Sequence, residues 1–243
     1  MGTRAQMAGF LLAGGALALS GCTQAGTTAV SRPRPAVATV TPATPDPTPT
    51  PPPTLKPGAR GEHVKALQRR LKELGYAPGP IDGRYGNLTQ MAVWAFQKVN
   101  RIKVSDTVGE RMWAALENPK APRPVSKRRE PERVDVDLRR QYLVVYKAGR
   151  PVLISHISSG SGEHVLTPTG DFRTGRRVSG WETSPLGRLY NPVYFYGGIA
   201  FHGSLSVPRY PASHGCVRLP MNVAEEFPKL VGTNVPVHVR RPE

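Results

Sequence analysis

The residues best suited to chemistry lie in a short stretch towards the C-terminal end of the chain. An apolar run ends at His202, and ten residues then separate this histidine from the segment Ser213 to Arg218, which reads Ser-His-Gly-Cys-Val-Arg. A thiol at its ordinary pKa is mostly protonated near neutral pH, so a nucleophilic cysteine needs a base, and a nearby histidine is the usual one. The spacing therefore indicates Cys216 as a nucleophile with a histidine partner.

Three interpretations of this cluster remain open from the residues alone. If Cys216 is a nucleophile, Gly215 lets a substrate approach the backbone closely. The backbone amides of Gly215 and Cys216 could then donate hydrogen bonds to an oxyanion. Alternatively, Cys216, His202 and His214 could ligate zinc, since three protein ligands suffice for a catalytic site. A lone cysteine can also be a small buried hydrophobic residue beside structural histidines.

Strands must position these residues. From Arg133 onward apolar and polar residues alternate, Gly, Pro and Ser clusters punctuate the chain, and the first long amphipathic helix is expected at 223–231. The pattern predicts a mostly β domain in which Asp135 and Asp137 occupy the solvated face of a strand. This region contains no Gly-x-Ser-x-Gly elbow, Ser-x-x-Lys, His-Glu-x-x-His or phosphate-binding loop, which excludes several enzyme classes.

The C-terminal motifs resemble those of the L,D-transpeptidase (YkuD-type) catalytic domain, and the likeness covers 133–240 of a predicted domain at 133–243. The motifs are His202-Gly203 followed by Ser213 to Arg218, Gln141 to Tyr146 before a glycine hairpin, and Thr167-Pro168-Thr169-Gly170-Asp171-Phe172. The resemblance implies that Cys216 is the nucleophile, that His202 accepts and donates the proton, and that the backbone of Gly203 orients the ring. The residues expected to line the site and hold the substrate or the oxyanion are Ser213, His214, Gly215 and Arg218.

The same resemblance implies acyl transfer between cell-wall peptides, without a metal or cofactor. Cys216 would form a thioester with a donor stem peptide, and an amine of a second stem peptide would resolve it into a 3→3 crosslink. The alternatives are an L,D-carboxypeptidase, in which water resolves the thioester, and a catalytically inactive wall-binding lipoprotein. Carbapenem-type β-lactams are the expected inhibitors.

Residues 58–118 are expected to form a small domain of three helices. Val64, Leu67 and Leu71 recur at helical spacing, and Asn87 and Thr107 are predicted to start the second and third helices. The connection from Tyr76 to Thr89, with its Asp-Gly-x-Tyr-Gly-x-x-Thr pattern, resembles peptidoglycan-binding domain 1, which implies docking on wall glycan or stem peptide. The side chains of Asp82, Tyr85 and Thr89 could contact that ligand or could only brace the loop.

The N-terminal residues predict the compartment. Residues 1–21 combine one arginine, an apolar run and small residues before Cys22, as an export signal does, and Leu19 to Cys22 resembles the lipobox of bacterial lipoproteins. Cys22 is therefore the expected lipidation site. We predict an exported bacterial lipoprotein that is anchored to a membrane by its lipid and faces the cell wall.

Two linkers complete the predicted organisation. Residues 22–57 carry the lipidated cysteine and a Pro/Thr-rich spacer, and 119–132 form a basic linker that is either a solvated hinge or an anion-binding patch. The chain has 33 Lys and Arg against 17 Asp and Glu, a net charge of +16, which favours a polyanionic neighbour. Export excludes nucleic acid and leaves a membrane or an anionic wall polymer. The predicted fold class is multidomain, with a three-helix peptidoglycan-binding domain and a mostly β catalytic domain.

Overall fold

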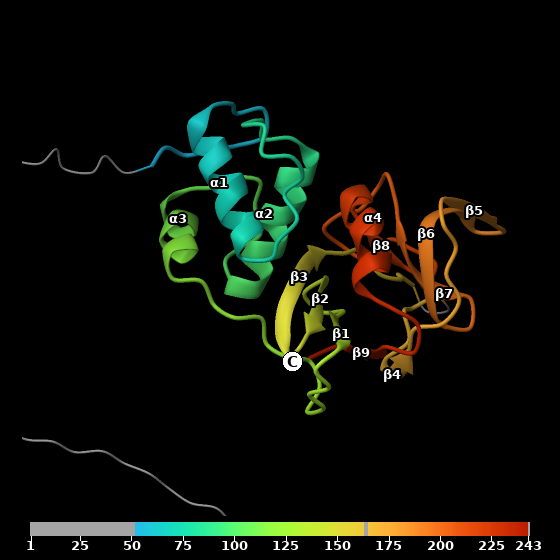
Figure 1. Ribbon diagram of the computed structural model, residues 1–243. Coiled ribbons are helices and arrows are strands. Elements are labelled where there is room, and N and C mark those ends of the chain that lie inside the picture. The colour runs from blue at the N-terminus through green and yellow to red at the C-terminus, as the bar shows by residue number, and fades with distance from the viewer. Residues whose placement is uncertain (1–51, 163–164, 243) are drawn as a thin grey trace, which may run out of the picture. The chain divides into compact units, whose positions relative to one another are not determined.

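The computed structural model describes residues 52–162 and 165–242. The predicted signal peptide, Cys22 and most of the Pro/Thr-rich spacer lie outside these residues. Within them the chain forms three helices, then nine strands with a fourth helix before the last strand (Figure 1). In this part of the chain we find no helix of the length and hydrophobicity needed to cross a membrane. The predicted multidomain fold class is confirmed.

The helical region consists of α1 (Glu62–Glu73), α2 (Asn87–Asn100) and α3 (Glu110–Glu117). The apolar spacing predicted these helices correctly, because Val64, Leu67 and Leu71 are fully buried. The predicted start of α2 at Asn87 is confirmed, whereas α3 begins at Glu110 and not at Thr107. Glycines cap both helices, and no side chain makes a capping hydrogen bond. Leu55, at the end of the predicted spacer, is buried in this region and pairs with Val108.

A five-stranded sheet holds the first four strands of the β region and its last one, in the order β3-β2-β1-β9-β4. Its strands are β1 (Arg133–Asp137), β2 (Tyr142–Lys147), β3 (Arg150–His156), β4 (Gly170–Arg173) and β9 (Pro236–Arg240). Only the β1–β9 pair among these neighbours is parallel. The last described strand, β9, lies inside this sheet, between β1 and β4.

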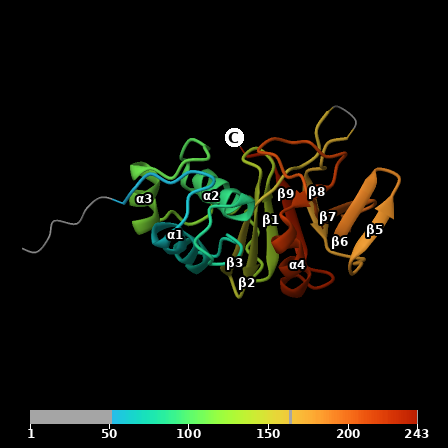
Figure 2. The ribbon, with the colours of Figure 1, turned by 90° about the horizontal axis from the view of Figure 1, so that it is seen from above.

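A four-stranded sheet, in the order β5-β6-β7-β8, holds the residues with predicted chemistry. Its strands are β5 (Trp181–Ser184), β6 (Gly187–Tyr196), β7 (Ile199–Gly203) and β8 (Val217–Leu219), and α4 (Met221–Leu230) follows directly. The helix contacts β6 and β7, and its Phe227 stacks against Phe201 of β7. One hydrophobic cluster joins this helix to both sheets (Figure 2).

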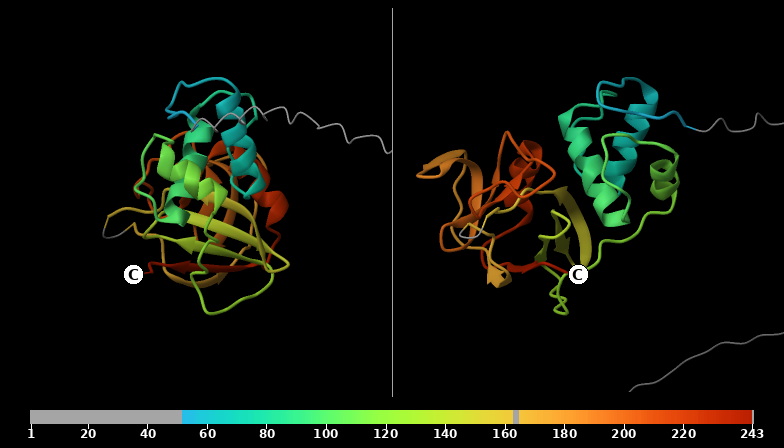
Figure 3. Two further views of the ribbon diagram at one scale, coloured as in Figure 1. Left: turned by 90° about the vertical axis from the view of Figure 1, so that its left-hand side faces the viewer. Right: turned by 180° about the vertical axis from the view of Figure 1, so that it is seen from behind.

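The helical region and the five-stranded sheet share a second hydrophobic cluster. Helical residues such as Val93 and Phe96 lie in one cluster with four buried sheet residues: Tyr142, Val144, Tyr146 and Ile154. The backbone N–H of Ile154 also donates to the carbonyl of Gly75 (2.8 Å). Figure 3 shows α2 beside β3 from two further sides. The helices therefore cover an apolar face that the sheet would otherwise expose to water.

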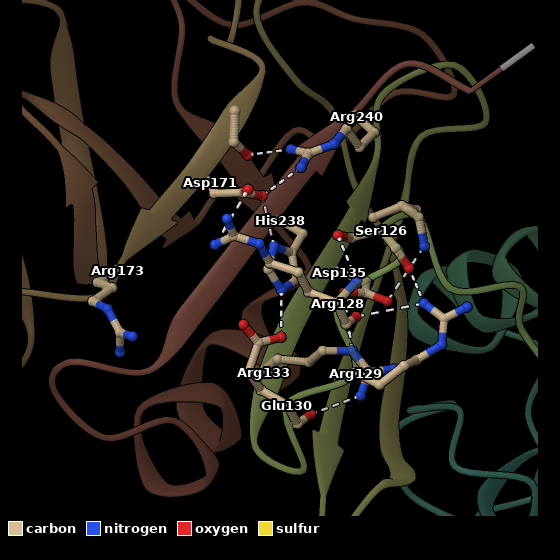
Figure 4. A network of polar contacts seen from close by, with 12 residues as sticks. Ser126, Arg128, Arg129, Glu130, Arg133, Asp135, Asp171, Arg173, His238 and Arg240 are labelled. Atoms are coloured by element: carbon tan, nitrogen blue, oxygen red, sulfur yellow. Dashed lines mark hydrogen bonds and ion pairs between the residues drawn. The ribbon is translucent and has the colours of Figure 1, made fainter.

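The prediction that Asp135 and Asp137 face solvent was wrong, since each is only 1% exposed. The segment before β1 covers this face: the N–H of Val125 donates to Asp135, and Glu130 bonds His238 of β9 (Figure 4). Asp135 pairs with the buried Arg133 at 3.2 Å. Burial nevertheless raises the pKa of the Asp135 carboxyl, more than the nearby Arg133 charge lowers it. Alternation failed as a guide because both faces of β1 are covered.

Candidate active site

The fold brings His202 and Cys216 to the same face of the four-stranded sheet. Strands β7 and β8 are parallel, with His202 directly opposite Arg218. Paired residues share a face and side chains alternate along a strand, so Cys216, two residues before Arg218, lies on that face as well. All three side chains line one cavity of about 640 Å³. Val217 and Leu219 point the other way, into the core with α4.

His202 is held with one ring nitrogen available as a base. Its Nδ1 lies 2.9 Å from the carbonyl oxygen of Gly203. A carbonyl only accepts, so Nδ1 carries the hydrogen and Nε2 of the neutral ring keeps its lone pair. Burial is the main cause that lowers the pKa of His202, and the positive charge of Arg218 lowers it further. The ring is therefore neutral and can accept a proton near neutral pH.

Gly203 is a glycine for reasons of packing. A Cβ at this position would lie 2.8 Å from the Cβ of Ala224 in α4 and 3.0 Å from the ring of Tyr190. A side chain would push the helix away from β7 and displace the carbonyl that orients His202. Gly203 therefore supports the site without lining the cavity.

The thiol of Cys216 is partly buried and unpaired. Its Sγ lies 3.8 Å from the carbonyl oxygen of Gly198, a weak hydrogen bond. Burial raises the pKa of this thiol, while a backbone hydrogen bond from Ala200 and the charge of Arg218 act in the opposite direction. The resting pair is therefore a neutral thiol and a neutral imidazole, which suits proton transfer during attack.

Backbone contacts hold the segment that precedes Cys216. Ser213 donates its hydroxyl to the carbonyl of Cys216 and accepts the N–H of Gly215 at 3.2 Å. Thr167 accepts the N–H of Gly160 and donates to the carbonyl of Gly215 at 2.7 Å. Gly215 has φ +111°, and a Cβ there would lie 2.8 Å from the side chain of Ile199. The Thr-Pro turn found in the sequence thus braces the nucleophile segment, a role that the sequence did not indicate.

The predicted site residues fall into two groups. Ser213, His214 and Arg218 line the cavity with Cys216 and His202, and His214 is exposed. Gly203 and Gly215 lie behind the cavity wall. In the part of the chain that the structure describes, no cluster of three or more His, Cys, Asp or Glu side chains could hold a metal ion, so the arrangement gives no support to the zinc interpretation.

The far wall of the cavity is a hairpin that sequence analysis missed. The turn Ser184 to Gly187 between β5 and β6 lines the cavity, with Leu186 68% exposed. Arg176 lines it too and bonds Glu182 (2.8 Å), which also accepts from Tyr194 (2.8 Å). Nothing in the local sequence distinguishes this hairpin from an ordinary surface turn, because its role depends on the pairing of β6 with β7.

The loop 204–212 between His202 and Ser213 is tied to the neighbouring strands and to the helical region. Nε2 of the buried His156 donates to the carbonyl of Val207 (3.1 Å), and Ser158 donates to that of Tyr210 (2.8 Å). Lys98 of α2 donates to Nδ1 of His156 at 2.6 Å. A buried chain of contacts therefore links α2 to a loop that adjoins the cavity.

In the motif of the helical region, the polar side chains bond to groups of the same region. Asp82 accepts from Gln68 (3.0 Å) and from the N–H of Arg84 (2.8 Å). The buried Tyr85 donates to the carbonyl of Asp106 (2.9 Å), and Thr89 donates to that of Pro78 (3.0 Å). These side chains brace the loop, which is the second of the two roles considered for them.

Comparison with known proteins agrees with these observations. Residues 60–116 match the family model for a putative peptidoglycan-binding domain, and 131–239 match that for the L,D-transpeptidase catalytic domain. An L,D-transpeptidase from Xylanimonas cellulosilytica is 38% identical, with a TM-score of 0.72 over 80% of this chain and 100% of that one. This chain belongs to the L,D-transpeptidase family.

A second solved L,D-transpeptidase, from Stackebrandtia nassauensis, is 22% identical with a TM-score of 0.49, and the match covers 81% of this chain and 99% of that one. By the residues that the two family models match, the L,D-transpeptidase catalytic domain comprises both sheets, α4 and the cavity with Cys216, and the peptidoglycan-binding domain comprises α1 to α3.

Proposed function

We propose that this L,D-transpeptidase forms 3→3 crosslinks between peptidoglycan stem peptides through a thioester on Cys216. The observation that carries the proposal is the placement of Cys216 and His202 on one face of adjacent strands, in one cavity. The hydrogen bond from Nδ1 of His202 to Gly203 supports it, because it leaves Nε2 free to act as the base.

In the first half-reaction Sγ of Cys216 attacks the carbonyl carbon between the third residue and the terminal D-Ala of a donor tetrapeptide. His202 Nε2 takes the thiol proton as the S–C bond forms. When the tetrahedral intermediate collapses, the C–N bond breaks and His202 returns the proton to the nitrogen of D-Ala. D-Ala leaves, and the donor peptide remains as a thioester.

In the second half-reaction a side-chain amine of another stem peptide attacks the thioester carbonyl. His202 accepts a proton from this amine, the C–S bond breaks, and the proton passes to the departing sulfur. The product is an amide between two third-position residues. His202 alternates between base and acid, which its neutral resting state and its buried position in the cavity support.

Charge on the oxyanion needs donors within the cavity. Arg218 lines the cavity on the same face as Cys216, and no ion pair or hydrogen bond engages its side chain within 52–162 and 165–242. We assign it to the oxyanion or to a substrate carboxylate. The N–H of Gly215 is partly engaged by Ser213, so the amide of Cys216 is the better backbone donor.

The location of the enzyme belongs to the same proposal. Residues 1–21 are a signal peptide, and Cys22 carries the lipid. Residues 22–57 span the distance to the wall, where the domain at 58–118 docks. Residues 119–132 connect that domain to the catalytic domain at 133–243. A Cys22→Ala variant should leave the membrane fraction, and retention there would contradict the lipid anchor.

Intact-mass spectrometry tests the chemistry. The chain from Pro49 to Glu243 holds both hydrophobic clusters and is used as wild type and as Cys216→Ala. We expect a thioester adduct from a disaccharide-tetrapeptide, and an adduct from a carbapenem, on the wild type only. Adding an acceptor amine should convert the thioester to a crosslinked product. Free tripeptide in place of that product would indicate the carboxypeptidase, and no adduct on the folded wild type would refute the acyl-enzyme.

A further inference from the structure

A second pocket, of about 460 Å³, lies where α2 ends and the peptidoglycan-binding domain meets the catalytic domain. Three separate segments line it: the end of α2 and the residues after it, the turn between β1 and β2, and the loop 204–212. Its six cationic residues are Lys98, Arg101, Lys103, Arg139, Arg140 and Arg209. Positive charge from distant parts of the chain therefore converges on one concavity.

Few acidic groups offset this charge. Asp137 pairs with Arg140 at 3.2 Å, and Asp106 lies 3.8 Å from Arg209. Across the described ranges, no ion pair or side-chain hydrogen bond engages Arg101, Lys103 or Arg139, and all three are exposed. Six cations thus face two carboxylates, and three of the cations are available to a ligand.

The backbone holds one of these cations in an unfavourable conformation. Arg101 follows α2 with φ 59°, in the left-handed region that favours glycine or asparagine at the end of a helix. Cations near a helix C-terminus are favourable in themselves. That effect does not account for Arg139, Arg140 and Arg209, which come from the other domain.

The floor of the pocket is Lys98, only 7% exposed. Its Nζ donates to the carbonyl of Gln141 (2.8 Å) and to Nδ1 of His156 (2.6 Å). Both acceptors are neutral, because burial lowers the pKa of His156 to about 3. Burial also lowers the pKa of Lys98 to about 7. The carboxylate of Asp137 acts in the opposite direction but is paired with Arg140, so an anion in the pocket would add negative charge that favours a protonated Lys98.

We propose that this pocket binds phosphodiester groups of an anionic cell-wall polymer. Arginine forks match phosphate oxygens, and the exposed Arg101, Lys103, Arg139 and Arg209 allow a chain of repeated charges to run across the pocket mouth. The choice of a wall polymer rests on the proposed location of the enzyme. The site would hold the domain junction, and not only the helical domain, on the wall.

The proposal is tested by measuring how tightly purified poly(glycerol phosphate) binds to the Pro49–Glu243 chain. The affinity is measured by calorimetry at several salt concentrations. The pocket variant is Lys103→Ala/Arg139→Ala. The matched control is Lys56→Ala/Arg111→Ala, which removes two exposed cations from the same protein outside the pocket. We expect the pocket variant to weaken binding roughly tenfold and to reduce the slope of log affinity against log salt by about two. The control should stay within about twofold of wild type.

Three results would overturn the proposal. Equal weakening of both variants would indicate non-specific charge, equally tight binding of poly-glutamate would remove the preference for phosphate, and binding only to anionic phospholipid vesicles would indicate a membrane surface. Carbapenem acylation of Cys216 is measured on the same variants and should be unchanged. A failure of the phosphate site is thereby separated from a failure of the enzyme.

Discussion

The loop from Asp82 to Thr89 and the segment from Ser213 to Arg218 both carry family motifs, and they differ in where their polar side chains find partners. In the first, Asp82, Tyr85 and Thr89 all bond to groups of their own domain. In the second, His214 and Arg218 face the cavity without a side-chain hydrogen bond to any described residue, and Cys216 has one weak contact.

This difference distinguishes residues that stabilise the fold from residues that can bind a substrate, which the presence of a family motif alone does not. A polar side chain that is satisfied internally cannot bind a ligand without losing a bond, whereas one that faces a cavity loses only water. The peptidoglycan-binding motif therefore stabilises a loop, and a ligand bond to the buried Tyr85 or Thr89 would replace one of these internal bonds. The exposed Asp82 receives both of its bonds on Oδ1. The catalytic motif leaves the side chains of His214, Cys216 and Arg218 available to a substrate, whereas the hydroxyl of Ser213 braces the segment.

The largest expected effect is on the fold. Deleting 58–118 would expose Tyr142, Val144, Tyr146 and Ile154, each now at most 4% exposed. Burial of such side chains contributes roughly 1.5–3 kcal/mol each, and the sum is comparable to the whole stability of a domain. We expect the deleted protein to lose its cooperative thermal transition and its reactivity with carbapenem.

A milder variant keeps this prediction testable. Phe96→Ala, in the shared cluster, should lower the free energy of unfolding by roughly 3–5 kcal/mol while the folded fraction still acylates. A deletion protein that unfolds cooperatively and acylates like the intact chain would show that the two domains are independent.

The second effect is on the chemistry. His202→Gln should slow acylation of Cys216 by roughly 10²–10⁴-fold, the usual contribution of a general base, with little change in thermal stability. His63→Gln, on the exposed side of α1, is the matched control. Rates come from intact-mass time courses, and a loss below about tenfold would mean that another group takes the thiol proton.

Much of the fold follows from local sequence. The spacing of Val64, Leu67 and Leu71 fixed α1, and alternation in 134–146 indicated strands correctly. Alternation did not give the burial of Asp135, because the segment at 119–132 and the helices cover a face that a sheet alone would expose. The start of α2 at Asn87 was predicted correctly, whereas α3 begins at Glu110 and not at Thr107, because Gly109 takes the cap position without a side-chain bond.

Some residues of the site were likewise predicted from local sequence, and others were not. Cys216 and His202 were predicted because both belong to a compact motif. The cavity hairpin at 184–187 and the pair Lys98–His156 were not, since these depend on contacts between segments up to 58 residues apart. A lone lysine on a helix is normally solvated, so only the packing of α2 on the sheet reveals that Lys98 is buried.

A smaller effect is expected in the bracing loop. The buried hydroxyl of Thr89 accepts from Gln68 (3.1 Å) and donates to the carbonyl of Pro78. Thr89→Val leaves the carbonyl of Pro78 without this donor, while Gln68 keeps its bond to Asp82, and should lower the free energy of unfolding by about 1–3 kcal/mol in urea denaturation. Thr54→Val, at an exposed position, serves as the control. Slower acylation of Cys216 in the folded Thr89→Val protein would contradict the conclusion that Thr89 only stabilises its loop.

The smallest effect is a nearly flat pH profile of carbapenem acylation. Burial lowers the pKa of His202 and raises that of Cys216, so the neutral pair persists between the ordinary values of about 6.5 and 8.5. The rate should change less than about twofold across that window and fall only at lower pH, where His202 becomes protonated and cannot accept the thiol proton. Arg218 lowers both pKa values, so Arg218→Gln should raise both and move the acid limb to higher pH. An acid limb that stays in place would show that Arg218 does not act on His202 through charge.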